Sequence, residues 1–229
     1  MIRSRFQQGL AELKEKLLLM GGMAESALER STEAYQKRDP SLCQAVFDRE
    51  KEINAMEREI DELAIDLLAM QQPMAVDLRF ILAVVKINAD LERVGDQAVN
   101  IAQRTLDMVQ SAPIAVPVDI ARMTATVATM VQRALESFID GKADLAQAVL
   151  EMDNIVDRMK DEAFIALVRR MNEDPAEVRQ YLDVLLISRN LERVADHATN
   201  IAEDVIFWVR GADVRHNAAL ESEADSHSR

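Results

Sequence analysis

Apolar residues recur at helical spacing along almost the whole chain, and this pattern is interrupted at only a few places. The interruptions are Pro40, Pro73, Gly141 and Pro175, together with segment 111–118, which holds two prolines four residues apart. The pattern predicts six helices, over residues 6–37, 41–71, 75–109, 119–139, 142–171 and 175–209.

One twelve-residue segment occurs twice in the chain. Residues 91–102 read L-E-R-V-G-D-Q-A-V-N-I-A and residues 191–202 read L-E-R-V-A-D-H-A-T-N-I-A, so nine of the twelve positions are identical. Residues 144–157 also align on residues 41–54. These matches indicate an internal duplication. We therefore predict an all-α fold of two tandem, similar antiparallel three-helix bundles.

The duplication sets the expected domain boundaries. We expect a first bundle over residues 1–110, a linker over 111–118, a second bundle over 119–211 and a disordered acidic tail over 212–229. Helices of about 30 residues are about 45 Å long, so the molecule should be elongated.

Composition supports long helices. Hydrophobic residues make up 49% of the chain, aromatic residues only 4%, and there are just 6 Gly and 5 Pro. Two of the glycines, Gly21 and Gly22, lie inside the first predicted helix, where each costs up to about 1 kcal/mol relative to Ala. This pair predicts a close approach of another helix or a kink.

The charge and cysteine content narrow the class of protein. A net charge of −13 argues against binding to nucleic acid and against simple adhesion to anionic lipid. A single cysteine, Cys43, excludes an internal disulfide. Neither an apolar signal sequence nor a membrane-spanning apolar stretch is visible, so we expect a cytoplasmic protein that reaches a membrane only through a partner.

Both copies of the repeated segment keep two carboxylates and an amide at positions i, i+4 and i+8. These residues are Glu92, Asp96 and Asn100 in the first copy and Glu192, Asp196 and Asn200 in the second. A helix places such residues in one stripe, which here borders the apolar face. Like charges at this spacing destabilise an isolated helix by about 0.2–0.5 kcal/mol, so we expect a compensating cation.

Two kinds of cation could fill this role. The stripes could pair with arginines, among which Arg79, Arg179 and Arg189 are candidates. Alternatively, oxygen ligands without thiolate or imidazole suit hard cations such as Mg²⁺, Mn²⁺, Ca²⁺ or iron, and zinc also remains a candidate. Further ligands are expected on a facing helix, where Glu50 and Asn54 have Asp153 and Asp157 as their counterparts in the second half. Because Asn54 occupies the position equivalent to Asp157, the first half has one carboxylate fewer here. We therefore expect the first metal site to be weaker or differently loaded.

The sequence offers little support for catalysis. The chain has three His and lacks the paired E-x-x-H motifs of a di-iron oxidase, and we expect a surface or packing role for His197. Serine-triad, glycine-loop and redox-cysteine signatures are also absent. A metal-dependent bundle enzyme and a metal-free scaffold remain the alternatives to a regulator.

The paired L-E-R-V-[GA]-D motifs, Met20-Gly21-Gly22-Met23 and the segment F-W-V-R-G at 207–211 resemble the PhoU family of bacterial phosphate-transport regulators. The resemblance covers about residues 5–216. It implies an all-α cytoplasmic protein of two three-helix bundles that acts without catalysing a reaction. It also implies a negative regulator of the phosphate-starvation response, in contact with the ATPase subunit of a phosphate ABC transporter and with a sensor histidine kinase.

The family further implies multinuclear metal clusters, with iron in some members. By matching position these fall on Glu92, Asp96, Glu192 and Asp196, with Asn100 and Asn200 extending the stripes and Glu50, Asp153 and Asp157 matching less securely. We also expect a homodimer. Because no phosphate-cradling loop is visible, we expect phosphate itself to be sensed by the transporter.

Overall fold

The computed structural model describes residues 2–70 and 73–211 of the chain. Its elements are six long α-helices and one short 3₁₀ turn, which precedes the last helix. They are α1 (Ile2–Lys37), α2 (Pro40–Met70), α3 (Ala75–Val109), α4 (Ile120–Asp140), α5 (Ala143–Glu173), η1 (Pro175–Glu177) and α6 (Val178–Arg210). The predicted all-α fold of two tandem three-helix bundles is confirmed.

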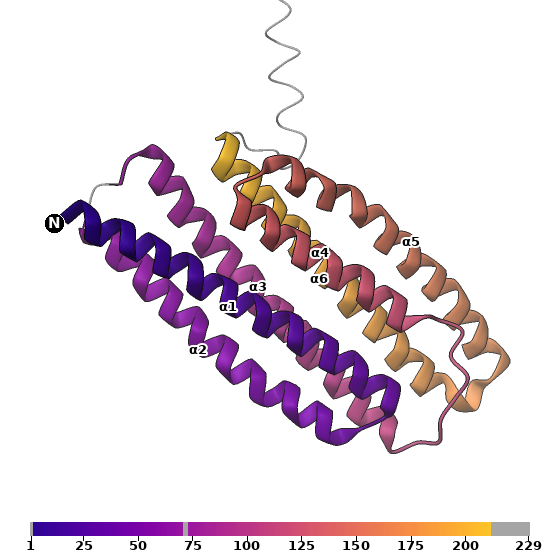
Figure 1. Cartoon of the computed structure of the whole chain (residues 1–229). Helices are drawn as coiled ribbons and strands as arrows, with labels where there is room; N and C mark the ends of the chain where they lie inside the picture. The colour runs from indigo at the N-terminus through magenta and orange to yellow at the C-terminus, as the bar shows by residue number, and fades with distance from the viewer. Residues whose placement is uncertain (1, 71–72, 212–229) are drawn as a thin grey trace, which may run out of the picture.

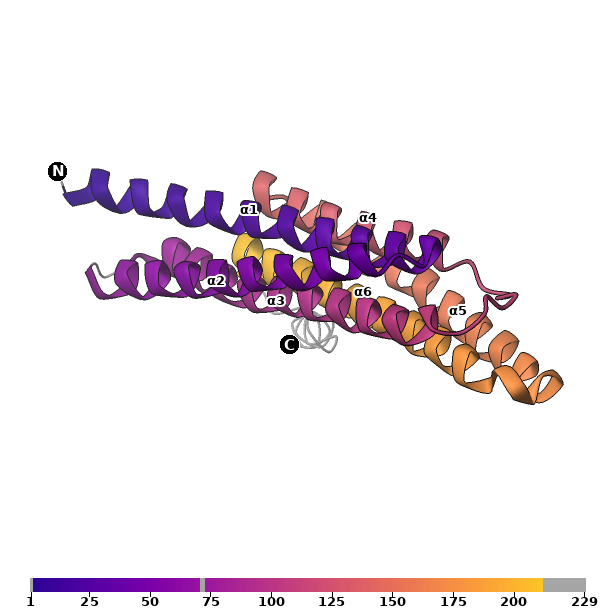
Figure 2. The same ribbon diagram turned by 90° about the horizontal axis from the view of Figure 1, so that it is seen from below.

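The two bundles lie side by side with their helices roughly parallel to one long axis (Figure 1). Helices α3 and α6, which carry the repeated segment, pack against each other at the centre. The view from below shows α1 and α4 on one side and α2, α3, α6 and α5 on the other (Figure 2). The duplicated stripes are therefore carried by the two central helices of an elongated molecule.

Local signals in the sequence fix the helix ends around the second bundle. Asp119 caps α4, because its carboxylate accepts a hydrogen bond from the backbone N–H of Arg122 at 2.9 Å. Gly141 ends α4 with φ of 62°, a left-handed conformation that glycine adopts without strain. On the other side of the linker, the guanidinium of Arg38 donates to the carbonyls of Met108 and Ser111 at the end of α3. These contacts hold the linker segment at both ends.

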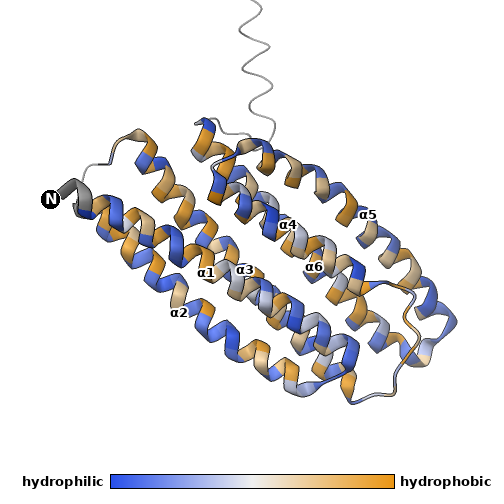
Figure 3. Cartoon of the chain, viewed as in Figure 1, coloured by the Kyte–Doolittle hydropathy of each residue, from blue (hydrophilic) through white to orange (hydrophobic). Residues whose placement is uncertain are grey.

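One continuous core joins the two bundles. Each helix buries its apolar stripe while hydrophilic residues recur along its length (Figure 3). At the contact between α1 and α4, the buried hydroxyls of Thr32 and Thr124 lie 2.9 Å apart. A Cβ on Gly21 would come within 2.5 Å of the Leu135 side chain, so this glycine gives the close helix approach that the sequence predicted. The bundles are therefore packed as one body.

Three aromatic rings from both bundles meet near one end of this core. Phe80 of α3 stacks on Phe138 of α4 at a centroid distance of 5.6 Å. Trp208 of α6 lies 5.3 Å from each of them. Such ring pairs stabilise by about 0.5–1.5 kcal/mol beyond the area that they bury. The cluster thus adds a specific connection between the first and second halves.

The helix boundaries agree with the sequence except at two ends. Helix α1 begins at Ile2 rather than near residue 6, since the first residues contain no breaker. Helix α6 begins at Val178, because Pro175 opens a 3₁₀ turn instead of the helix itself. The tail expected over 212–229 lies outside the described residues. None of the described helices combines the length and the apolar character needed to cross a membrane.

Candidate functional site

The repeated carboxylates lie where α3 and α6 meet the middle helix of their own bundle. Glu92 and Glu192 are half-buried, and each follows a fully buried leucine, Leu91 or Leu191. The stripes therefore border the core, as the helical spacing predicted. Their neighbours on α2 and α5 decide how each stripe is neutralised.

The first acidic cluster consists of Glu50 and Glu57 on α2 with Glu92 and Asp96 on α3. The pKa of Glu92 is raised by partial burial and then by the charges of Asp96, Glu57 and Glu50, while Arg93 lowers it. The pKa of Asp96 is raised by partial burial and by Glu50. Among the described residues, no lysine or arginine lies within 4 Å of these four carboxylates. This cluster is electrostatically under-compensated.

The second acidic cluster consists of Asp153 and Asp157 on α5 with Glu192 and Asp196 on α6. Here Lys160 supplies a positive charge, with its Nζ 3.1 Å from Asp157 Oδ1 and 3.3 Å from Glu192 Oε1. The pKa values of Asp153 and Asp196 are still raised, first by partial burial and then by neighbouring carboxylates. A side chain of the protein therefore already occupies the position of a counter-cation.

The arginines considered from the sequence do not fill this role. Arg79 donates through Nε to the carbonyl of Trp208. Arg179 lies near Asp183, whose pKa is raised by partial burial, an effect that Arg104 and Arg179 oppose. Arg189 lies in a pocket between α3 and α6. In the part of the chain that the structure describes, none of the three lies within 4 Å of a stripe carboxylate.

The donor groups for a metal are only partly assembled. Within residues 2–70 and 73–211, no three carboxylate, imidazole or thiolate groups form a set that could hold one ion. The first cluster nevertheless suits a cation, because its carboxylates repel one another. In addition, the side-chain oxygen of Asn54 is buried without a hydrogen-bond partner, while its amide nitrogen donates to Glu50. The metal assignment stays a prediction.

The two asparagines of the stripes lie apart from the facing carboxylates. Asn200 donates through Nδ2 to Asp90 of α3 at 3.2 Å, and Asn100 lines a pocket between α3 and α6. His197 reaches the same Asp90, with Nδ1 2.9 Å from Oδ1. The expected packing role of His197 is thus a polar contact between the two bundles.

Two residues that distinguish the acidic clusters were not predicted from the sequence. Glu57 and Lys160 occupy equivalent positions, each seven residues after Glu50 or Asp153. The i, i+4, i+7 spacing on the middle helices could have placed them on the stripe-facing side. Only the packing of α5 on α6, however, shows that Lys160 reaches Glu192.

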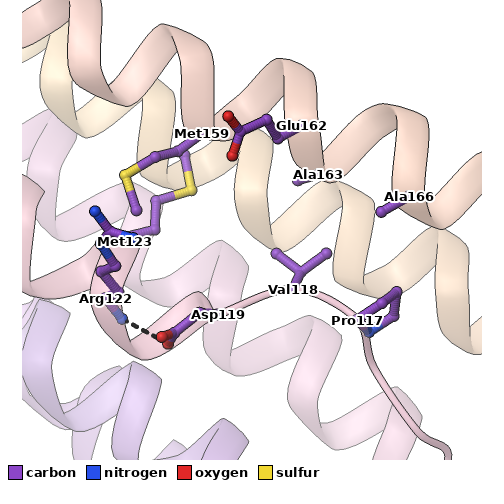
Figure 4. A pocket seen from close by; sticks show the side chains of 9 residues that line it. All are labelled: Pro117, Val118, Asp119, Arg122, Met123, Met159, Glu162, Ala163 and Ala166. Atoms are coloured by element: carbon purple, nitrogen blue, oxygen red, sulfur yellow. Dashed lines mark hydrogen bonds between the residues drawn. The ribbon is translucent and has the colours of Figure 1, made fainter.

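A pocket of about 220 Å³ opens between the linker, α4 and α5, away from the stripes (Figure 4). Met123 and Met159 face each other in it, and Asp119 is engaged in capping α4. Glu162 is the remaining carboxylate of the lining. The pocket therefore offers no pair of free acid and base groups.

A larger groove of about 430 Å³ lies on the outer face of α5 and α6, beside the second cluster. Its lining includes Phe164 and Leu182, whose side chains are 54% and 45% exposed. Lys160 and Glu192 also lie in the lining, where they give the apolar surface a charged edge. An apolar groove with a polar edge is a common docking surface for a partner helix.

Comparisons with known proteins identify the fold and its repeat. The PhoU domain family matches the chain twice, over residues 17–105 and 120–205. A phosphate-specific transport system accessory protein PhoU homolog from Pseudomonas aeruginosa is 40% identical over 217 residues, covering 94% of this chain and 89% of that protein. A homolog with the same name from Clostridium acetobutylicum is 35% identical over 95% of this chain and 100% of that protein.

Solved structures agree with these matches. The crystal structure of PhoU from Pseudomonas aeruginosa has a TM-score of 0.87 and 39% sequence identity, and covers 90% of this chain and 100% of that one. The phosphate transport system regulatory protein PhoU from Streptococcus pneumoniae has a TM-score of 0.81 at 23% identity, over 91% of this chain and 99% of that one, and so supports the fold alone. With two matched repeats, a shared fold and relatives that align over nearly its whole length, the chain belongs to the PhoU domain family.

Proposed function

We propose that this protein is a non-catalytic regulator of a phosphate-specific transport system. The observation that carries the proposal is the 40% identity, over 94% of the chain, to a relative named as an accessory protein of such a system. The protein would act in the cytoplasm as a negative regulator of phosphate uptake and of the starvation response.

The proposed partners are the ATPase subunit of a phosphate ABC transporter and a sensor histidine kinase. The groove between α5 and α6 supports contact with a helix of one partner, because exposed Phe164 and Leu182 would be buried there. Regulation requires that the protein bind one state of a partner more tightly than another, since equal affinity shifts no equilibrium. A homodimer is part of the same proposal.

We propose that a divalent cation binds the first acidic cluster in preference to the second. Glu50, Glu92 and Asp96 would have to draw together around it, since they do not form an ion-binding set in this structure. The cation would supply the positive charge that Lys160 supplies in the other half. This order is the reverse of the one expected from Asn54. In this proposal the metal tunes the stability of the bundle and the charge of its surface, without taking part in a reaction.

Binding measurements with purified partners test the regulatory proposal. The wild-type protein should bind the transporter ATPase subunit and the cytoplasmic part of the kinase, and Phe164→Glu should weaken binding of at least one by about tenfold or more, because a charge enters a buried contact. Ile65→Glu is a matched control, since it changes an exposed apolar residue on α2, away from the groove. Failure of the wild-type protein to bind either partner would contradict the proposal.

Gene deletion tests the same proposal in cells. Cells that lack the protein should express phosphate-starvation genes even in phosphate-rich medium, and the wild-type gene should restore repression. Normal repression in the deletion strain would exclude a negative regulatory role.

A further inference from the structure

The contact between α3 and α6 carries two pockets built from equivalent positions of the repeat. The first is lined by Asp90, Arg93 and Asn200, with Ala89 and Asp204 beside them. The second, the basic pocket, is lined by the counterparts one hundred positions away, Asn190, Arg193, Asn100, Arg189 and Arg104, together with Leu186. The duplication thus gives the same cavity twice, at two levels along the helix pair.

The two pockets carry opposite charge. In the first pocket the carboxylates of Asp90, Glu203 and Asp204 outnumber the two cations, Lys86 and Arg93. Lys86 Nζ lies 2.9 Å from Asp204 Oδ1, and Asp90 binds His197 and Asn200. In the basic pocket, Asp204 is replaced by Arg104 and Asp90 by Asn190. Its lining contains three arginines and no carboxylate.

The arginines of the basic pocket are only weakly compensated from outside. Arg104 forms two long ion pairs, with Asp183 at 3.7 Å and with Asp107 at 3.8 Å, so its charge is partly compensated. Arg189 and Arg193 are exposed, and within the described ranges neither has a carboxylate within 4 Å. Exposed charges farther than about 8 Å are largely screened at physiological ionic strength, so the acidic surface elsewhere does not cancel this local charge.

The hydrogen-bonding groups of the pocket are donors suited to an oxyanion. Guanidinium groups bind tetrahedral oxyanions through paired N–H donors, and the amides of Asn100 and Asn190 add neutral donors. Neither amide is used by another group among the residues that the structure describes. The volume of about 210 Å³ is below the usual range for drug-sized ligands, which favours a small ion or one end of a larger molecule.

We propose that the basic pocket between α3 and α6 binds a phosphate group through Arg104, Arg189 and Arg193. The ligand is inorganic phosphate or the terminal phosphate of a nucleotide, since both present the same oxyanion. The site lies beside the proposed docking groove, because Arg189 and Leu186 line both, but phosphate binding can be measured on the purified chain without any partner.

Calorimetric titration of the full chain with inorganic phosphate tests this site at constant ionic strength. The wild-type protein should bind saturably, and the double variant Arg189→Ala/Arg193→Ala should lose at least about tenfold in affinity, because charge-assisted hydrogen bonds are removed. Arg30→Ala/Arg58→Ala is the matched control. It removes the same charge from exposed positions on α1 and α2 and should bind as the wild type does.

Asn190→Asp gives a second test without shortening a side chain. It gives the basic pocket the carboxylate that Asp90 supplies in the first pocket. This carboxylate should repel phosphate and compete for the arginines, so we expect phosphate binding to weaken at least about tenfold. Asn172→Asp, at an exposed position of α5, is the control for the added negative charge. Circular dichroism would verify that each variant is folded.

A parallel titration with ATP distinguishes the two sources of the phosphate group. Tighter binding of ATP, lost in the arginine double variant, would support the site with a nucleotide as its ligand, whereas weaker binding of ATP would support inorganic phosphate. No saturable binding of either ligand at millimolar concentration would overturn the proposal. Equal binding by the wild type and the arginine double variant would overturn it as well.

Discussion

The two acidic clusters share their backbone setting and differ in how their charge is compensated. In the second, Lys160 pairs with Asp157 and Glu192 across α5 and α6. In the first, the equivalent position is Glu57, which adds a fourth carboxylate and raises the pKa of Glu92. The duplication therefore preserved the stripe but not its electrostatic balance. One position decides whether the compensating cation belongs to the protein or must come from solution.

The largest change in stability should come from giving the second acidic cluster the residue that the first has at the equivalent position. Lys160→Glu removes the ion pairs with Asp157, Asp161 and Glu192 and adds a like charge, so we expect a loss of about 1 kcal/mol in the free energy of unfolding. For a chain of this size that corresponds to about 2–4 °C in melting temperature. Thermal unfolding with and without Mn²⁺ measures it, and the metal should restore part of the loss.

Arg158→Glu is the matched control for Lys160→Glu, since it makes the same charge change at an exposed position of α5. It should change stability by less than half as much. Equal effects of the two substitutions would mean that net charge, rather than the cluster, determines the stability.

The reverse change should stabilise the first cluster by a smaller amount. Glu57→Lys places a cation beside Glu92, and we expect a gain of about 0.5 kcal/mol, typical of a partly exposed ion pair. The same variant should no longer be stabilised by divalent cations, which titration followed by thermal unfolding would measure.

Glu62→Lys, an exposed position on α2, controls for charge in the Glu57→Lys experiment. It should retain the metal response of the wild type. An undiminished metal response in Glu57→Lys would contradict the proposed location of the cation site.

The smallest effect concerns pH. Because the pKa of Asp96 is raised in the folded state, the folded protein binds more protons than the unfolded chain between the ordinary and the raised value. The contribution of Asp96 to stability therefore decreases as pH rises through this window. Asp96→Asn should be a few tenths of a kcal/mol more stable than the wild type at pH 7, and the difference should shrink on acidification. Urea unfolding with chelator present, between about pH 4 and pH 7, measures it.

Asp66→Asn, at an exposed position of α2, serves as the control for the pH experiment. It should show no such pH-dependent difference. A variant Asp96→Asn that is less stable than the wild type at neutral pH would mean that the carboxylate is stabilising, and that its pKa is lowered instead.

Much of the fold followed from local sequence signals. Prolines and glycines near Pro40, Pro73 and Gly141 marked the helix ends, and the repeated segment indicated two similar bundles. The position of the carboxylates beside the core also followed, because helical spacing alone places Glu92 and Asp96 next to Leu91 and its neighbours.

The features that depend on contacts between distant helices did not follow from the sequence. The pairing of His197 with Asp90 joins residues 107 positions apart, and it depends on the packing of α3 on α6. Asn200 was grouped with the carboxylates by spacing, yet the same packing directs its amide to Asp90. Periodicity gives the face of a residue but not its partner on another helix.

The aromatic cluster at the end of the core also makes the protein a source of its own optical signal. Trp208 is the only tryptophan of the chain, and it lies against Phe80 and Phe138, which come from helices of both bundles. The wavelength and quenching of its fluorescence should therefore report whether the two halves stay packed together. A titration with metal, phosphate or a partner could be followed through this residue without any added label.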